Sequence, residues 1–256
     1  MSDTEKSLSM ETIKSWLDTT VKPFLKQSTE EEDYQSFMRD EPRPIIRDQN
    51  NFYSCADGIV LYNTRVKNGN AKLEVKGVPY TVNEVLGQDL IDGPALVCGV
   101  FMTLADIHLN RVPYDAIHTF KMLPPIESFN MSMDEIEERL IGSLFRGRIR
   151  PGVGFKYLKN NARVLNRFYI PKYDYSYYIV QIADYDVDVI QHFHMRQNTR
   201  VHQGNRFSFI RWGSQCDLVM PLRNDLKIKP LIGEMMHVKA GVDKIATFYG
   251  PDNLSS

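Results

Sequence analysis

From residue 52 onward, most of the chain consists of short runs rich in Val, Ile, Tyr and Phe, separated by Gly, Asn, Asp and Pro. Such runs favour β-strands, because β-branched and aromatic side chains pack well on a pleated surface and the intervening residues favour turns. The clearest runs are GIVLYNTRV, AKLEVKGVPYTV, YSYYIVQIADY, DVDVIQHFHM and RFSFIRW. We therefore expect a mainly β (α+β) fold with an antiparallel core, either a sandwich or a closed barrel.

Three local patterns refine this expectation. The apolar stretch GPALVCGVFMTLA (93–105) is too short to span a bilayer and is typical of a buried strand. The KNGN segment (67–70) predicts a hairpin turn. The segment 132–145 predicts one helical insertion in the β-domain, because Ser132 and Glu135 have the spacing of a capping box.

Residues 8–27 predict an amphipathic helix that Ser9 would cap and Pro23 would kink or end. Its apolar side chains, at helical spacing, are Ile13, Trp16, Leu17, Val21, Phe24 and Leu25. Either this face packs on the β-domain, or the helix lies on a membrane surface with Trp16 and Phe24 in the lipid interface. An acidic linker follows, so we expect residues 1–37 to form the helix and linker and residues 38–256 to form the main domain.

The composition is that of an ordinary globular protein: 256 residues, 43% of them hydrophobic and 25% charged. With 31 basic and 32 acidic side chains there is no basic excess to neutralise phosphates, so we expect no nucleic-acid partner. Cys55, Cys98 and Cys216 form no CxxC pair, which favours reduced thiols. The polar N-terminus does not resemble a signal peptide. We expect a cytoplasmic protein, with peripheral membrane contact through residues 8–27 as the open alternative.

Several common catalytic signatures are missing from the chain, including GxGxxG, a Walker loop, HExxH and GxSxG. His192 and His194 share one face of a predicted strand and His202 is nearby, so a metal site is conceivable. No third ligand has a convincing spacing, and we therefore expect no metal.

Three short motifs carry residue types suited to nucleophilic chemistry. CADG places Asp57 at the start of the β-region, LADIHLNRVP places His108 after the buried strand, and RWGSQCDL places Gly213 and Ser214 between apolar runs. If folding brings them together, the imidazole can take the serine proton while the carboxylate orients the ring. Spacing alone leaves open whether Ser214 is a turn residue, a nucleophile or a position of self-cleavage.

In their order along the chain, these motifs resemble the phosphatidylserine decarboxylase family, and in particular its short forms. The resemblance runs over about residues 38–248. MRDEPRPI and SCADGIV are similar to the family's arginine–proline and SPADG segments, and LADIHLNRVPYDA is similar to the short-form DVHVNRAPVDG. KGVPYTVNEVLG, NNARVLNRF, VQIADYDVD and VHQGNRFSFIRWGSQCDLVMP also resemble family segments and occur in family order.

The resemblance implies a proenzyme that breaks its own chain between Gly213 and Ser214. Ser214 would attack the carbonyl of Gly213, and elimination and hydrolysis would leave a pyruvoyl group at the new terminus. Two chains would result, residues 1–213 and 214–256. Asp57 and His108 match the family's acidic and histidine positions and would handle protons in processing and in catalysis, with Arg111 in a supporting role.

The implied reaction is the decarboxylation of phosphatidylserine to phosphatidylethanolamine through a Schiff base on the pyruvoyl group, in the domain formed by residues 38–256. The pyruvoyl group would take up the charge left on Cα, so no metal is required. Two alternatives remain: decarboxylation of a free amino acid, and an unprocessed relative that acts as a binding module. Because family members commonly dimerise, a homo-oligomer is expected.

The chain also departs from the family pattern. The differing positions are Cys55 where proline is usual, Arg111 where long forms have a second histidine, Ala116 where glycine is usual, and Gln215 and Cys216 after the serine. Residues 121–150 resemble no family segment, which leaves the substrate open.

Overall fold

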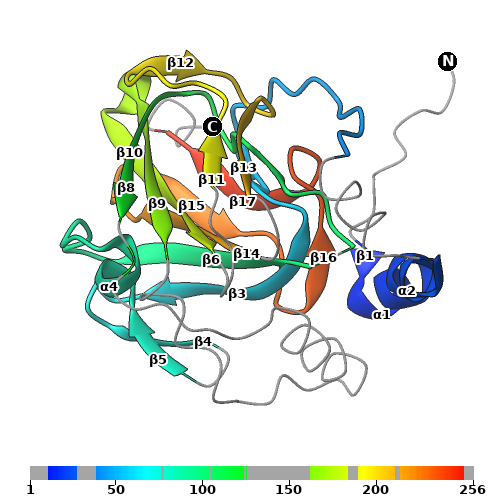
Figure 1. Cartoon of the computed structure of the whole chain (residues 1–256). Helices are drawn as coiled ribbons and strands as arrows, with labels where there is room; N and C mark the ends of the chain where they lie inside the picture. The colour runs from blue at the N-terminus through cyan, green and yellow to red at the C-terminus, as the bar shows by residue number, and fades with distance from the viewer. Residues whose placement is uncertain are drawn as a thin grey trace, which may run out of the picture.

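The computed structural model describes residues 11–27, 39–75, 78–103, 105–123, 125, 162–183, 190–210 and 214–250. It consists of large antiparallel sheets with a helical segment at the N-terminal side (Figure 1), so the expectation of a mainly β fold is confirmed. The helix expected at 132–145 lies outside the described residues, and so does the expected boundary at residue 38.

The largest sheet of the described chain has nine strands, and every neighbouring pair in it is antiparallel. In spatial order the strands are β1 (Glu11–Thr12), β16 (Met236–Val238), β3 (Gly58–Val66), β6 (Ala95–Met102), β14 (Ser214–Pro221), β10 (Tyr175–Ala183), β9 (Arg163–Ile170), β8 (Ala116–Leu123) and β12 (Thr199–Val201).

Three smaller sheets complete the described β-structure. They are formed by β11 (Ile190–His192), β13 (Arg206–Ile210) and β7 (Leu109–Arg111); by β15 (Lys227–Pro230), β17 (Lys244–Tyr249) and β2 (Asn51–Tyr53); and by β4 (Lys72–Val75) and β5 (Val78–Thr81). The short helix α4 (Val82–Leu86) follows β5, and a 3₁₀ turn (Pro171–Tyr173) joins β9 to β10.

Strand β6 separates the two largest hydrophobic clusters of the fold. All eight of its residues are buried, as the apolar run predicted. Leu96, Cys98, Val100 and Met102 pack into one cluster, and Ala95, Val97 and Phe101 pack into the other. Because β6 pairs with β3 on one side and β14 on the other, its register determines which residues of these strands lie next to each other.

The hairpin predicted at KNGN is wrong. The chain does turn there, and Ala71 N donates to Asn68 O at 3.2 Å. However, β3 and β4 on either side do not pair; β4 pairs with β5 instead. Gly69 N donates to Ile91 O at 2.9 Å, and a Cβ on Gly69 would lie 2.4 Å from that oxygen. The turn therefore packs against the segment around Ile91. The local turn residues do not specify this contact.

The N-terminal helix passes through Pro23 and continues. It runs as α1 (Ile13–Trp16), a π-helical stretch (Leu17–Val21) and α2 (Lys22–Gln27), and it is capped by Thr12. Proline has no N–H to donate to the carbonyl four residues earlier. The wider π-helical turn lies just before the proline and accommodates that missing bond.

The apolar face of this helix packs on the β-domain. Trp16, Leu17 and Val21 are buried in a cluster with Ile59 and Ala105. The Trp16 ring, only 1% exposed, stacks on His237 with ring centroids 4.6 Å apart. The packing alternative is thus confirmed, and insertion of Trp16 into lipid is contradicted by its burial. In the described part of the chain, no helix combines the length and the apolar character that a membrane span requires.

We expect Trp16→Ala to lower the free energy of unfolding by about 3–5 kcal/mol, because it removes a buried ring and leaves a cavity. Urea denaturation measures the change. Phe193→Ala, at an aromatic residue that is 46% exposed, is the control and should cost much less. Equal small losses in the two variants would contradict the packing of Trp16.

Candidate active site

The registers of β3 and β14 on β6 bring two of the predicted motifs to one end of the sheet. Ile59 lies opposite Phe101, and Ser214 lies opposite Met102. Asp57, directly before β3, and Ser214, the first residue of β14, therefore flank the same end of β6. Neighbouring strands are about 4.8 Å apart, which puts the two backbones roughly 10 Å from each other.

Asp57 is buried and held by two donors. Its Oδ2 accepts from Arg43 Nη2 at 2.7 Å, and its Oδ1 accepts from the backbone N–H of Ala240 at 2.7 Å. Burial raises the pKa of Asp57 to about 6, although the Arg43 charge acts in the opposite direction. A carboxyl group that titrates near neutrality can take or give a proton under physiological conditions.

The position after Asp57 requires a glycine, Gly58. Its φ is +148°, and a Cβ there would lie 2.0 Å from the carbonyl oxygen of Phe101. Glycine lets the chain pass this close to β6. The close approach holds the Asp57 backbone against the end of β6.

His108 is fully buried between two backbone carbonyls. Its Nε2 lies 3.0 Å from Thr103 O, just beyond β6, and its Nδ1 lies 3.2 Å from Ile210 O, at the end of β13. Ile210 precedes Gly213 by three residues. The ring therefore connects the end of β6 with the strand that leads to the Gly–Ser pair. A neutral imidazole has one N–H, so its tautomer decides which carbonyl receives the hydrogen bond.

Asp57, His108 and the start of β14 thus lie at one end of β6, and each oxygen of the Asp57 carboxylate accepts a hydrogen bond from a group other than His108. The contacts shown for Asp57 are to Arg43 and Ala240, and those shown for the His108 ring are to two carbonyls. Gly213 lies outside the described residues, and Ser214 is described through its backbone. The roles of these residues accordingly remain predictions.

Arg111 anchors the segment that contains Asp40 and Arg43. Its guanidinium donates to Gly204 O at 3.0 Å and to Asp40 Oδ1 at 3.1 Å. Arg206 also pairs with Asp40, at 2.7 Å. Since Arg43 follows Asp40 by three residues, this anchoring helps to bring Arg43 to Asp57.

Sequence reasoning did not single out Arg43, Asp106 or His237. Asp106 is buried and pairs with His237 Nε2 at 2.7 Å, and its other oxygen accepts from the backbone N–H and hydroxyl of Thr103. Burial favours the protonated acid, but the charge and hydrogen bond of His237 prevail and lower the pKa of Asp106. These bonds fix the residue whose carbonyl faces His108. Asp106 and Arg43 lie within recognised motifs, whereas nothing in the sequence marks His237 as a partner.

Two of the three histidines considered for a metal site, His192 and His202, contact other side chains. Nε2 of His192 and Nε2 of His118 both contact Asn166 Oδ1, at 2.7 Å and 2.9 Å. Burial lowers the pKa of both rings to about 4, so they are neutral at pH 7. His202 instead lies 3.5 Å from Asp115. Across the described ranges, no group of three His, Cys, Asp or Glu side chains could hold a metal ion.

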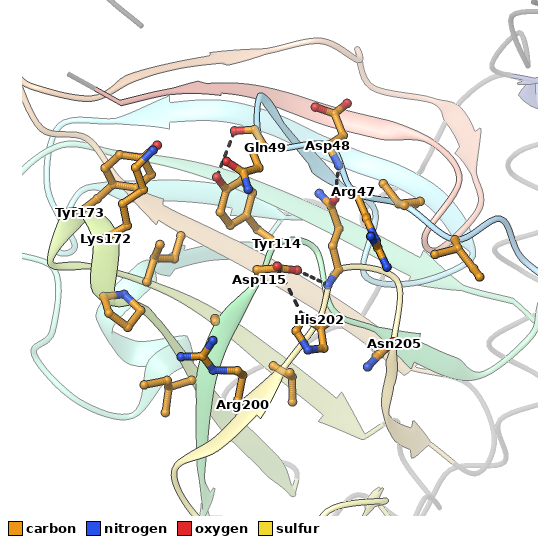
Figure 2. Close-up of a pocket in the computed structure, with 18 residues that line it drawn as sticks. Arg47, Asp48, Gln49, Tyr114, Asp115, Lys172, Tyr173, Arg200, His202 and Asn205 are labelled. Carbon is orange, nitrogen blue, oxygen red and sulfur yellow. Dashed lines mark hydrogen bonds and ion pairs between the residues drawn. The ribbon is translucent and has the colours of Figure 1, made fainter. Parts of the chain in front are cut away.

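The structure also has a cavity of about 640 Å³ (Figure 2), and neither Asp57, His108 nor Ser214 belongs to its lining. One wall is the segment 45–49, which begins two residues after Arg43. Exposed Arg47, Lys172 and Arg200 line it together with apolar side chains. The segment 39–49 therefore links Asp57 to a cavity whose lining includes these three cations and the carboxylates of Asp48 and Asp115.

Comparison with known proteins gives a consistent result. The family model described as phosphatidylserine decarboxylase matches residues 34–246. A phosphatidylserine decarboxylase proenzyme of Symbiobacterium thermophilum is 23% identical over 197 residues, which cover 76% of this chain and 71% of the relative. A Methanocaldococcus jannaschii protein, provisionally named an archaetidylserine decarboxylase proenzyme, is 25% identical over 204 residues, covering 78% of this chain and 84% of the relative. No solved structure gives a significant match.

We expect Arg43→Gln to raise the pKa of Asp57 above its value of about 6, because the Arg43 charge is the largest influence that lowers it. The ¹³C resonance of the carboxyl, identified by its loss in Asp57→Asn, reports the titration. Arg39→Gln is the matched control, since Arg39 donates to Ala105 O rather than to Asp57. An Arg43→Gln variant whose carboxyl titrates like that of the wild type would contradict the assigned contact.

Proposed function

Because the chain belongs to the phosphatidylserine decarboxylase family, we propose that it cuts itself between Gly213 and Ser214 and then decarboxylates a serine phospholipid. The observation that carries the proposal is the convergence of Asp57, His108 and the start of β14 at one end of β6. The pyruvoyl group that Ser214 would become supplies an electron sink for the charge left on the substrate Cα.

We assign the transfer of the serine proton to His108. Its ring nitrogens contact the backbone carbonyls of Thr103 and Ile210. Thr103 follows Met102, the residue opposite Ser214, and Ile210 precedes Gly213 by three residues. Removing the hydroxyl proton makes Ser214 a better nucleophile towards the Gly213 carbonyl. In either tautomer one of the two carbonyls accepts the ring N–H and anchors the imidazole. The other nitrogen keeps a lone pair that can take up a proton and return it to carbon later in the reaction.

Asp57 is proposed to serve as a second proton carrier. Its pKa of about 6 gives a mixture of both protonation states near neutrality. Arg43 and Ala240 hold the carboxylate in one orientation, which a group that transfers protons in a fixed geometry requires. In this arrangement Arg111 acts indirectly, through the segment that carries Arg43.

The proposed substrate class rests on the relatives and on the cavity. The relatives are named for phosphatidylserine and archaetidylserine, two lipids that share a phosphoserine headgroup. The cavity has cationic Arg47, Lys172 and Arg200 and apolar walls, which suits a glycerophosphate. Asp48 and Asp115 also line it, but their carboxylates accept hydrogen bonds from neighbouring protein groups. A decarboxylase of free amino acids and an unprocessed binding module remain the alternatives.

Self-cleavage is tested by intact mass under denaturing conditions. We expect two wild-type chains, residues 1–213 and a pyruvoyl-terminated 214–256, because Ser214 supplies both the nucleophile and the new terminus. Ser214→Ala should remain one chain. Ser176→Ala, at a serine outside the site whose hydroxyl binds Arg167, is the control and should be cleaved. An uncut wild-type chain of 29.6 kDa would refute the proposal.

The substrate is tested by CO₂ release from phosphatidylserine vesicles and from free serine. We expect activity on the vesicles, and a several-fold higher KM for Arg200→Glu because a cation of the cavity is reversed. Arg196→Glu, at an exposed arginine outside the cavity, changes the overall charge equally and is the control. Activity on free serine would contradict the lipid as the substrate. Equal losses in the two variants would contradict a role of the cavity in lipid binding.

A further inference from the structure

One buried ionisable pair, His237 and Asp106, has no direct part in the proposed reaction. His237 Nε2 lies 2.7 Å from Asp106 Oδ1, and the two side chains are 3% and 2% exposed. The other nitrogen of the His237 ring, Nδ1, is buried and has no hydrogen-bond partner among the described residues. Within the described part of the chain, Asp106 is thus the hydrogen-bond partner of this ring.

Asp106 in turn holds the residue that contacts His108. Its Oδ2 accepts from the backbone N–H of Thr103 at 2.9 Å and from the Thr103 hydroxyl at 2.8 Å. The backbone N–H of Asp106 donates to the Thr103 carbonyl at 3.0 Å. That same carbonyl lies 3.0 Å from His108 Nε2. A continuous series of contacts, each no longer than 3.0 Å, therefore leads from His237 to the His108 ring.

The large sheet and the N-terminal helix together set the position of His237. Its backbone pairs with Ile59 of β3, two residues after Asp57. Its ring stacks on Trp16, with the centroids 4.6 Å apart and the two planes 15° apart. Stacking restricts the plane of the ring, so Nε2 stays directed at Asp106. The packed helix thereby contributes to the same series of contacts.

We propose that His237 is a positioning residue, which acts through Asp106 and Thr103 to hold His108 in the orientation that the reaction requires. This role rests on the proposed function, in which His108 moves protons. A buried carboxylate that rotates away from its donor loses a hydrogen bond in a medium of low polarity, and that loss is costly. Without the donor, Asp106 can turn away from Thr103, and the Thr103 carbonyl is then no longer fixed beside the His108 ring.

Three substitutions separate positioning from a role in packing alone. His237→Gln keeps an N–H donor for Asp106 but removes the ring that stacks on Trp16. His237→Phe keeps a ring against Trp16 but has no donor. Asp106→Leu removes the same link without leaving a buried charge unpaired, so it remains informative if His237→Phe does not fold. Positioning predicts that His237→Gln reacts faster than His237→Phe, whereas packing alone predicts no such advantage once both variants are folded.

The first test follows self-cleavage of the newly synthesised full chain by intact mass over time, at a temperature where circular dichroism shows every variant folded. We expect His237→Phe and Asp106→Leu to slow cleavage at least about tenfold, because a displacement of about 1 Å can cost roughly 100-fold in rate. His237→Gln should retain most of the wild-type rate. His192→Phe is the matched control, at a buried histidine that contacts Asn166 instead, and should cleave like the wild type.

The second test reads the position of His108 separately from activity. In a Ser214→Ala background, the ring ¹⁵N resonances of His108, identified by their loss in His108→Asn, report its hydrogen bonds. We expect them to shift in His237→Phe but not in His192→Phe. Unchanged His108 resonances in His237→Phe, or equal cleavage rates in His237→Phe and His192→Phe, would overturn the positioning role. A wild-type chain that stays uncut while these resonances still respond to His237→Phe would contradict the proposed function and leave the link between His237 and His108 intact.

Discussion

The pairing of β6 with β3 on one side and β14 on the other is the constraint on which the remaining structure depends. All of β6 is buried, so a slip of one residue would move its apolar side chains between two different clusters. This register brings the Asp57 loop and the first residue of β14 to one end of the strand. Gly58 packs closely against the Phe101 carbonyl, and this contact fixes the distance between the Asp57 loop and β6.

Buried ionisable side chains lie around this strand end, and two pairs of them are in direct contact. Arg43 pairs with Asp57, and His237 pairs with Asp106. Removing one member of such a pair leaves an uncompensated charge in a medium of low polarity, which is costly. The N-terminal helix contributes to the same arrangement, because Trp16 stacks on His237. Segments from both ends of the chain therefore support one site.

Sequence patterns were sufficient for the features that depend on short-range chemistry. The β-rich texture predicted an antiparallel fold, and the run 93–105 predicted the buried strand β6. The motif order predicted the family that the family model identifies. The apolar residues at helical spacing in 8–27 predicted a helix with one buried face. Whether this face packs on the β-domain or on a membrane was decided only by the structure.

What the sequence determined by itself is which residue types occur at which spacing: alternating apolar positions, a glycine after Asp57, and the ordered motifs. Only the tertiary structure decided their partners. KNGN turns the chain but joins strands that do not pair, Arg43 contacts Asp57, and His237 contacts Asp106. The physical reason is that propensity and spacing act over a few residues. Strand register and charge pairing depend on segments that lie far apart in the chain, up to the 226 positions between Glu11 and His237, and the packing of the whole core brings them together.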